Sequence, residues 1–145
     1  MTAKEYLKQA GQLDGRIKVK MARLASLSDL ATKATATLSG MPHNPSGSKS
    51  RMADTVEKIV DLERELEVEA DELVNLQREL SDTINAVSDL QMRMVLERRY
   101  LCSQSFEEIA EEMSFNVRWV YRLHGKGLKE VGEILARREA QQKNS

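Results

Sequence analysis

Residues 105–123 carry the pattern that decides the fold, and they read SFEEIAEEMSFNVRWVYRL. Ser105 followed three residues later by Glu108 is a capping box, a signature of a helix N-terminus. The apolar residues Phe106, Ile109 and Met113 then recur at helical spacing. This spacing predicts a short helix over about 106–113.

A second helix is expected after a three-residue turn over 114–116. Phe115 supplies one apolar side chain to fill the core at the turn, and Asn116 is a favourable N-cap. The following helix would bury Val120 and Leu123. Two helices joined in this way predict a helix-turn-helix, whose second helix lies in the major groove and presents its N-terminal residues to base edges.

The candidate DNA-contacting residues lie at the start of this second helix. They are Val117, Arg118, Trp119, Tyr121, Arg122 and Lys126. Residues 114–129 contain four Lys/Arg and no acid, whereas the preceding helix contains four Glu. Arg118 and Arg122 share a helix face, and either can bind guanine or phosphate through two hydrogen bonds. The alternative is a solvated face on an ordinary three-helix bundle. Trp119 precedes a buried position, so it is expected to face outward.

The rest of the chain predicts an all-α fold. Apolar residues recur at steps of three and four over about 2–38, which predicts a helix. Residues 39–50 contain both prolines, two glycines and four serines, which predicts a loop. Residues 52–101 contain no Gly or Pro and follow a heptad pattern, which predicts one long helix. From Asp89 onward the pattern changes to short helices, and Leu90, Met94 and Val95 supply the first of them. Glu69 and Thr83 occupy two core positions of that pattern, so the apolar stripe is expected to drift around the helix towards Ala70 and Ile84.

Charge is strongly segregated although the net charge is only −1. Residues 1–50 contain eight Lys/Arg and three Asp/Glu, whereas residues 51–88 contain four and eleven. These opposite signs favour an antiparallel basic–acidic hairpin, because two acidic helices would repel each other. We therefore expect a helical hairpin or coiled-coil arm over 1–88 and a helix-turn-helix bundle over 89–145.

Several functional classes find no support in the sequence. A single cysteine, Cys102, excludes an internal disulfide, and no metal-ligand set or phosphate-binding glycine motif is present. His43 and His124 have no evident catalytic partner. No apolar run approaches the ~20 residues of a membrane span, and the N-terminus lacks a signal-peptide pattern. We expect a cytoplasmic protein that is not an enzyme and uses no cofactor, metal or membrane.

The residues Tyr100-Leu101, Ser105 to Met113 and Val120 to His124 together resemble the fourth region of bacterial sigma factors, which recognises the −35 promoter element. The layout as a whole is similar to small phage late-gene regulators of the RinA/ArpU type. The resemblance implies DNA contact through five of the candidate residues, namely Val117, Arg118, Trp119, Tyr121 and Arg122. Sigma factors usually have polar residues where Val117 and Trp119 stand, and Gly where Ser114 stands, which puts an ordinary −35 target in doubt.

Three functions remain open from the sequence. The first is a phage-type transcription regulator that binds double-stranded DNA and contacts RNA polymerase, with the acidic arm as the candidate contact. The second is a small-terminase-like DNA-packaging protein, and the third is a protein-only interaction module. A homodimer through the arm would suit two DNA half-sites, whereas an intrachain hairpin would satisfy the arm within one chain.

Overall fold

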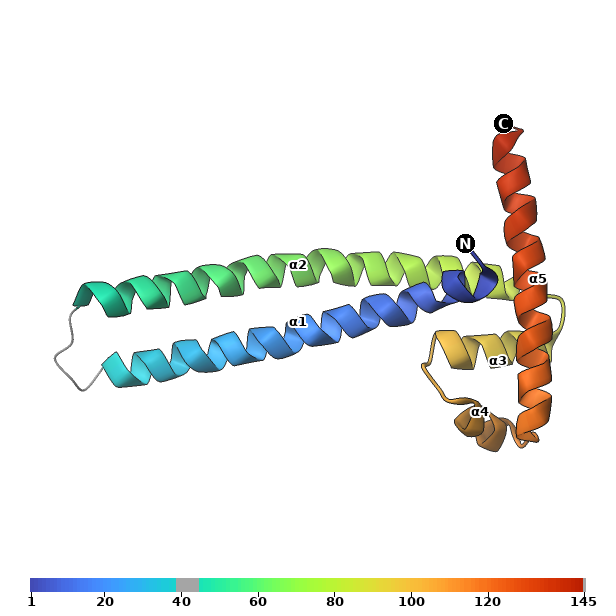
Figure 1. The fold of residues 1–145 in the computed structure, drawn as a ribbon, viewed down its shortest axis with the longest axis horizontal. Helices are drawn as coiled ribbons and strands as arrows, with labels where there is room; N and C mark the ends of the chain where they lie inside the picture. Colours follow the sequence, from blue (N-terminus) through green and yellow to red (C-terminus); the bar gives the residue numbers. More distant parts are fainter. Residues whose placement is uncertain (39–44, 145) are drawn as a thin grey trace. The chain divides into compact units, whose positions relative to one another are not determined.

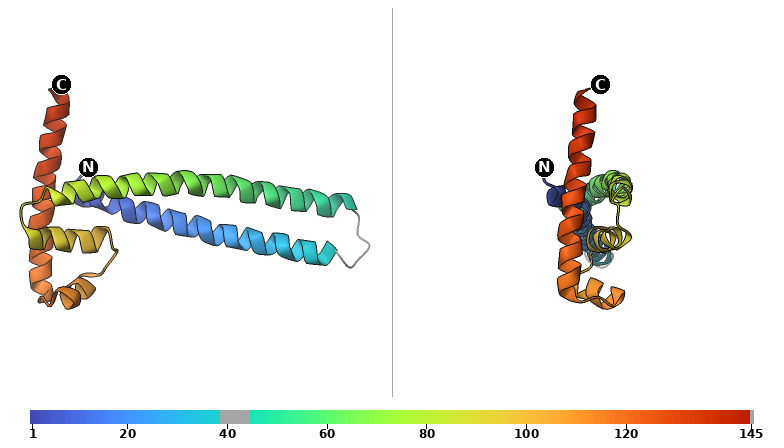
Figure 2. Two further views of the ribbon diagram at one scale, coloured as in Figure 1. Left: turned by 180° about the vertical axis from the view of Figure 1, so that it is seen from behind. Right: turned by 90° about the vertical axis from the view of Figure 1, so that its right-hand side faces the viewer.

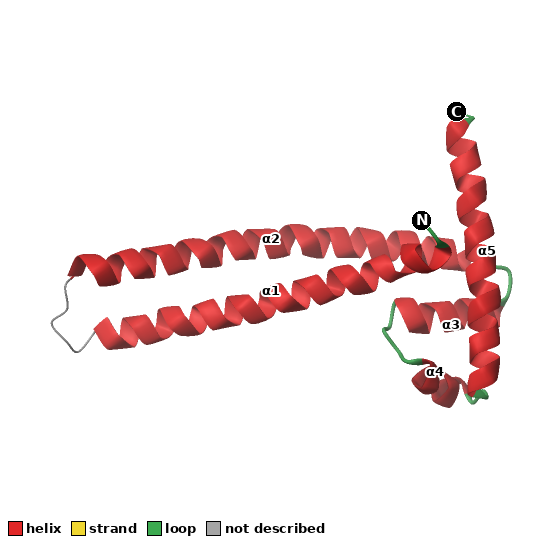
Figure 3. Ribbon diagram, viewed as in Figure 1, coloured by secondary structure: helices red, strands yellow, loops and turns green. Residues whose placement is uncertain are grey.

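The computed structural model describes residues 1–38 and 45–144, with side chains described over 1–33 and 50–144. All regular structure in this part of the chain is helical (Figures 1 and 3). The helices are α1 (Ala3–Leu38), α2 (Pro45–Asn85), α3 (Leu90–Tyr100), α4 (Phe106–Met113) and α5 (Val117–Lys143). The predicted all-α class is confirmed.

The chain divides into two compact units. One combines Met1–Gln12 with Leu73–Ser145 and is called the head below; the other, Leu13–Glu72, is called the arm. The predicted division between residues 88 and 89 falls between α2 and α3 and lies inside the head. Each unit is therefore described by itself.

Helix α1 begins where the sequence predicts. The Glu5 N–H donates to Thr2 Oγ1 at 3.1 Å, and the Thr2 N–H donates to Glu5 Oε2 at 3.2 Å. This reciprocal pair is a complete capping box, which satisfies two N–H groups that have no partner inside the helix. Helix α1 then continues through Gly11 and Gly15 without interruption.

The predicted loop over 39–50 is too long. Its first part, residues 39–44, lies outside the described residues, whereas residues 45–50 belong to α2. Pro45 is the first residue of that helix. Proline is tolerated there because its missing N–H would have no partner in the first turn anyway.

The helix predicted over 52–101 is interrupted between Asn85 and Leu90, and α3 beyond the interruption corresponds to the short helix expected from Asp89 onward. Val87 lies in the interruption and is 2% exposed, so it belongs to the core without belonging to a helix. The Ser88 N–H and hydroxyl donate to the two carboxylate oxygens of Glu130 at 2.7 and 3.1 Å. Leu90, expected in the buried stripe, is 60% exposed. Val87 keeps the heptad spacing across this interruption, but it is buried as a member of the apolar cluster of the head and not as part of a helix.

The polar residues in the heptad pattern of α2 are buried, and each has specific partners. In the head, the Thr83 hydroxyl lies 2.9 Å from the Tyr6 hydroxyl and accepts a hydrogen bond from Arg138 at 2.6 Å. In the arm, Glu69 is 7% exposed. Its neighbour Ala70 is exposed, whereas Ile84 beside Thr83 is fully buried, so the expected drift of the stripe is wrong at Ala70 and confirmed at Ile84.

Ion pairs join α1 and α2 within the arm, where the two helices run side by side in opposite directions (Figures 1 and 2). Lys20 pairs with Glu69 and, at 3.4 Å, with Glu65, while Arg16 lies 3.2 Å from Glu69. The hydrogen bond to Glu69 raises the pKa of Lys20. Basic α1 and acidic α2 therefore face each other in this unit.

The head is held together by a close approach of α3 and α5. Gly127 is buried, and a Cβ at this position would lie 3.0 Å from Leu96 Cδ1 and 3.2 Å from Leu96 Cγ. Leu96 is fully buried and has little room to move. Glycine at 127 therefore sets how closely the two helices can pack.

We predict that Gly127→Ala lowers the free energy of unfolding by about 1 kcal/mol, because overpacking against Leu96 outweighs the gain in helix propensity. Gly125→Ala is the matched control, since nothing lies within 4 Å of a Cβ there. It should raise the free energy of unfolding by up to about 1 kcal/mol. Urea denaturation of both variants measures the difference, and equal stabilisation by the two would refute the tight crossing.

Candidate nucleic-acid interface

Helix α4 is defined by caps at both ends. Ser105 is its N-cap, and the Ser105 Oγ accepts a hydrogen bond from the Glu108 N–H at 3.1 Å, as predicted. Ser114 ends the helix in the left-handed region, with φ 56° and ψ 41°. The N–H groups of Ser114 and Phe115 then bond to the carbonyls of Glu111 and Ala110, which is a Schellman arrangement.

Helix α5 begins directly after this turn. Asn116 is its N-cap, and Asn116 Oδ1 accepts a hydrogen bond from the Arg118 N–H at 2.8 Å, as predicted. Only residues 114–116 separate the two helices. The caps on both sides fix the direction in which the first turn of α5 leaves α4.

The inner face of this region is a small apolar cluster. Its buried members are Val95, Ile109, Ala110, Val120 and Leu123, which come from α3, α4 and α5. Phe115 in the turn and Val117 pack against it and are partly buried. Val117 thus differs from the other five candidate DNA-contacting residues, because its side chain contributes to the cluster.

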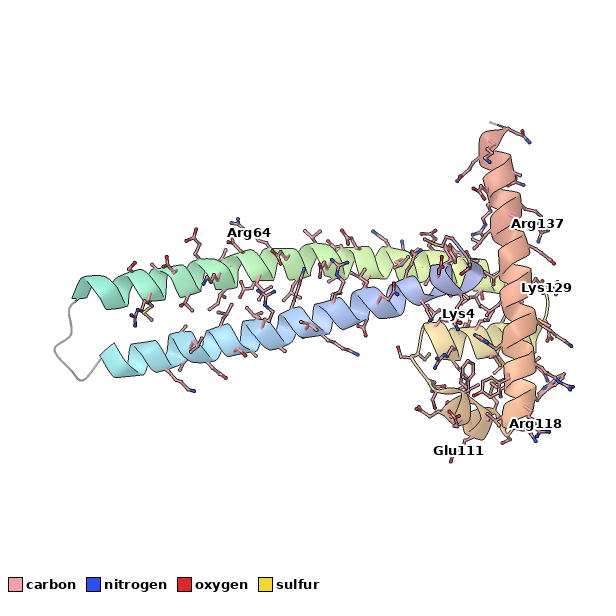
Figure 4. All side chains as sticks on the ribbon, in the orientation of Figure 1. Lys4, Arg64, Glu111, Arg118, Lys129 and Arg137 are labelled. Atoms are coloured by element: carbon pink, nitrogen blue, oxygen red, sulfur yellow. The ribbon has the colours of Figure 1, made fainter. Side chains whose placement is uncertain are left out.

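The outer face of α5 carries exposed cations. Arg118, Arg122 and Lys126 are exposed and recur every four residues, and Lys129 follows on the same face. Figure 4 shows Arg118 and Lys129 projecting from the same side of the helix. Within the described part of the chain, none of these four residues forms an ion pair. Lys129 belongs to the acid-free stretch 114–129 but is not among the six candidate contact residues.

Two aromatic residues flank these cations. Trp119 is 37% exposed, and Lys126 Nζ lies 5.8 Å from its ring centroid. Tyr121 is 48% exposed, and its ring centroid lies 4.7 Å from that of Phe106. Both rings are therefore accessible from outside while resting on other side chains, which limits the conformational entropy they lose on binding.

The acids of α4 lie apart from the exposed cations of α5. Glu107, Glu108, Glu111 and Glu112 are all exposed. Glu112 pairs with Arg98 of α3 and accepts a hydrogen bond from Gln104 Nε2 at 3.0 Å. The nearby acidic helix thus leaves the four cations of α5 without an internal counter-ion.

A buried polar pair beneath α5 was not predicted from the sequence. The Tyr100 hydroxyl lies 2.7 Å from His124 Nε2, and both residues are less than 10% exposed. The Phe106 ring packs edge-on against the His124 ring at 4.9 Å, with Arg99 Cζ 4.4 Å from the Phe106 centroid. This group of side chains links α3, the start of α4 and α5.

Burial determines the protonation of this pair. Burial, together with the smaller effect of the positive charges of Arg99 and Lys4, lowers the pKa of His124 from its ordinary 6.5 to about 4. Burial also raises the pKa of Tyr100. At neutral pH, His124 is therefore uncharged and adds no positive charge to the inner face of α5, opposite Arg118 and Arg122.

The depressed pKa predicts a pH-dependent stability. Between pH 6.5 and about 4 the unfolded chain binds a proton at His124 that the folded chain does not bind. Stability is therefore lost as the pH falls through this window. Urea denaturation at pH 7 and pH 4 should show wild type losing about 3 kcal/mol more than His124→Gln. An equal loss in both proteins would contradict a buried neutral His124.

Other kinds of site find no geometric basis. No cluster of three or more His, Cys, Asp and Glu suited to a metal ion occurs among the side chains described over 1–33 and 50–144. None of the helices described there combines the length and apolar character needed to cross a membrane. Cys102 is exposed and not disulfide-bonded.

Comparison with known proteins gives one match. Residues 41–132 match the family model described as Protein of unknown function (DUF1492), which covers more than half of the chain. No curated protein and no solved structure matches the chain. The matched segment includes α3, α4 and all six candidate contact residues. The chain is therefore a member of the DUF1492 family.

Proposed function

We propose that the protein binds double-stranded DNA in a sequence-specific manner, with α4 and α5 forming a helix-turn-helix. In this proposal the first half of α5 enters the major groove and α4 supports it from behind. Arg118 and Arg122 contact base edges, while Lys126 and Lys129 contact phosphates. A helix entering the major groove in this class of motif presents its N-terminal residues to the bases.

One observation carries the proposal: a well-capped helix exposes four cations on one face, and none has a counter-ion among the described residues. Exposed cations in a row gain most when they neutralise closely spaced negative charges, as along a DNA backbone. Arginine also forms two parallel hydrogen bonds with guanine. The partly exposed Trp119 and Tyr121 add apolar contacts of the kind that thymine methyl groups accept.

The arrangement of α4 supports this orientation. Its four glutamates would repel DNA if α4 itself were to enter the groove. Glu112 is held by Arg98 and Gln104. The positive outer face of α5 is therefore the favourable one to turn towards DNA, and Glu111 on α4 and Arg118 on α5 can be located in Figure 4.

The finer proposal is a phage-type transcription regulator of the RinA/ArpU kind, acting in the cytoplasm. It is supported by the resemblance of residues 100–124 to the fourth region of sigma factors. Contact with RNA polymerase is part of this proposal, and the acidic α2 segment is the candidate surface. No enzymatic step is required of the protein.

The proposal predicts that Arg118→Ala and Arg122→Ala each weaken specific DNA binding by about 1–3 kcal/mol. Binding is measured by mobility shift on a fragment of the operon that encodes the protein, at two salt concentrations. Wild-type affinity should fall steeply with salt, because bound cations release counterions from DNA. The double variant should show a shallower dependence.

The matched control is Arg51→Ala/Arg78→Ala, which removes two exposed arginines of α2. Its net charge equals that of the test variant, so non-specific electrostatics change equally. Equal affinities for the two double variants would refute a reading role for α5. Absence of binding even at low salt would leave the protein-only interaction module.

A further inference from the structure

The arm has almost no core of its own. Among the described apolar side chains that are less than one-tenth exposed, only Leu62 belongs to the arm. Both clusters of buried residues consist of side chains from the head. Two long helices that bury so little apolar surface between them are stabilised mainly by packing against something else.

A long groove runs between α1 and α2 on one face of the arm. Its larger part has a volume of about 720 Å³ and is lined by Val19, Ala22 and Leu27 of α1 and by Asp61 and Glu65 of α2, among others. A second part of about 370 Å³ shares Glu65 and continues past Val68 and Glu72. The groove therefore extends over several turns of both helices.

Apolar side chains at this groove are exposed to solvent. Val19 is 61% exposed and Val68 is 57% exposed, one on each helix. Ala22 is small, so another helix can approach the α1 side closely. Exposed valines beside a groove lined in part by small side chains are typical of a surface that packs against helices.

We propose that the partner is a second copy of this chain, bound arm to arm across a two-fold axis. In the arm, residues 13–38 contain five Lys/Arg and two Asp/Glu, whereas residues 50–72 contain three and nine. A two-fold axis parallel to the arm places the basic α1 of one copy against the acidic α2 of the other, and it does so twice. Charge complementarity thus favours a copy of the same chain over a helix of one charge sign.

The size of the surface fits a stable dimer. A helix of about 26 residues, as each side of the arm provides, is about 40 Å long. Two such helices side by side are about 20 Å wide, so one face offers about 800 Å² per partner. That area is what a specific interface of standard size buries on each side.

The seam of the heptad pattern is not free for this interface. Leu62 and Glu69 of that seam also line the groove, but both are buried, and Glu69 is paired with Lys20 of the same chain. Self-association therefore uses the exposed side chains of the groove, such as Val19 and Val68. The proposal does not rest on DNA binding, and its test requires no DNA.

The test is sedimentation equilibrium of the full-length chain carrying Val68→Lys, with Val60→Lys as the matched control. Both valines are exposed residues of α2, but only Val68 lines the groove. Lysine at 68 lies beside acids of its own chain, so the fold tolerates it, and it faces the basic α1 of the partner. We expect wild type and Val60→Lys to be dimers, and Val68→Lys to dissociate at least about tenfold more readily.

High salt should also weaken the wild-type dimer, because its charge pairs are exposed. Circular dichroism of each variant confirms that the helices remain folded. A wild-type protein that is monomeric at about 100 µM would overturn the proposal. So would a ring of more than two copies, or equal effects of the two lysine substitutions.

Discussion

The close packing of α3 against α5 at Gly127 is the contact on which the head depends. Val95 and Leu96 of α3 are adjacent and fully buried, yet each belongs to a different apolar cluster. Helix α5 is divided in the same way, since Val120 joins the cluster with α4 and Val131 joins the cluster with α1 and α2. Both helices therefore pack against two apolar clusters at the same time. The opposite face of α5 packs against neither cluster, and the exposed cations of this helix lie on that face.

The sign of charge on each surface follows from burial. His124 lies on the inner face of α5 and stays neutral because its surroundings exclude water. Arg118 and Arg122 lie on the outer face, where charge is fully solvated and inexpensive to maintain. In the arm, the buried Glu69 is compensated by Lys20 and Arg16. Glu69 is thus paired and His124 is neutral, whereas the exposed cations of α5, which form no ion pair among the described residues, are available to a partner.

Local features were predictable because short-range signals determine them. The caps at Thr2, Ser105 and Asn116 follow from side chains that bond to N–H groups two or three residues away. The candidate contact face could be read in the same way, although the partial burial of Val117 depends on its neighbours in space. Features that depend on distant residues could not be predicted. The Thr83 hydroxyl is hydrogen-bonded to Tyr6, 77 residues away, and His124 of α5 is hydrogen-bonded to Tyr100 of α3. The end of α2 at Asn85 could not be predicted, because Val87 continues the heptad spacing beyond it.

The most direct test of DNA recognition by α5 uses Trp119, the single tryptophan of the chain. Its fluorescence reports the environment of the outer face of α5 without any substitution. The measurement is quenching of Trp119 by acrylamide, with and without an operator fragment whose binding is followed independently by its own label. If α5 reads DNA, the bound fragment protects Trp119 from acrylamide and shifts its emission, in proportion to the fraction of protein that is bound. DNA that binds while leaving both the emission and the acrylamide accessibility unchanged would contradict a reading role for this helix.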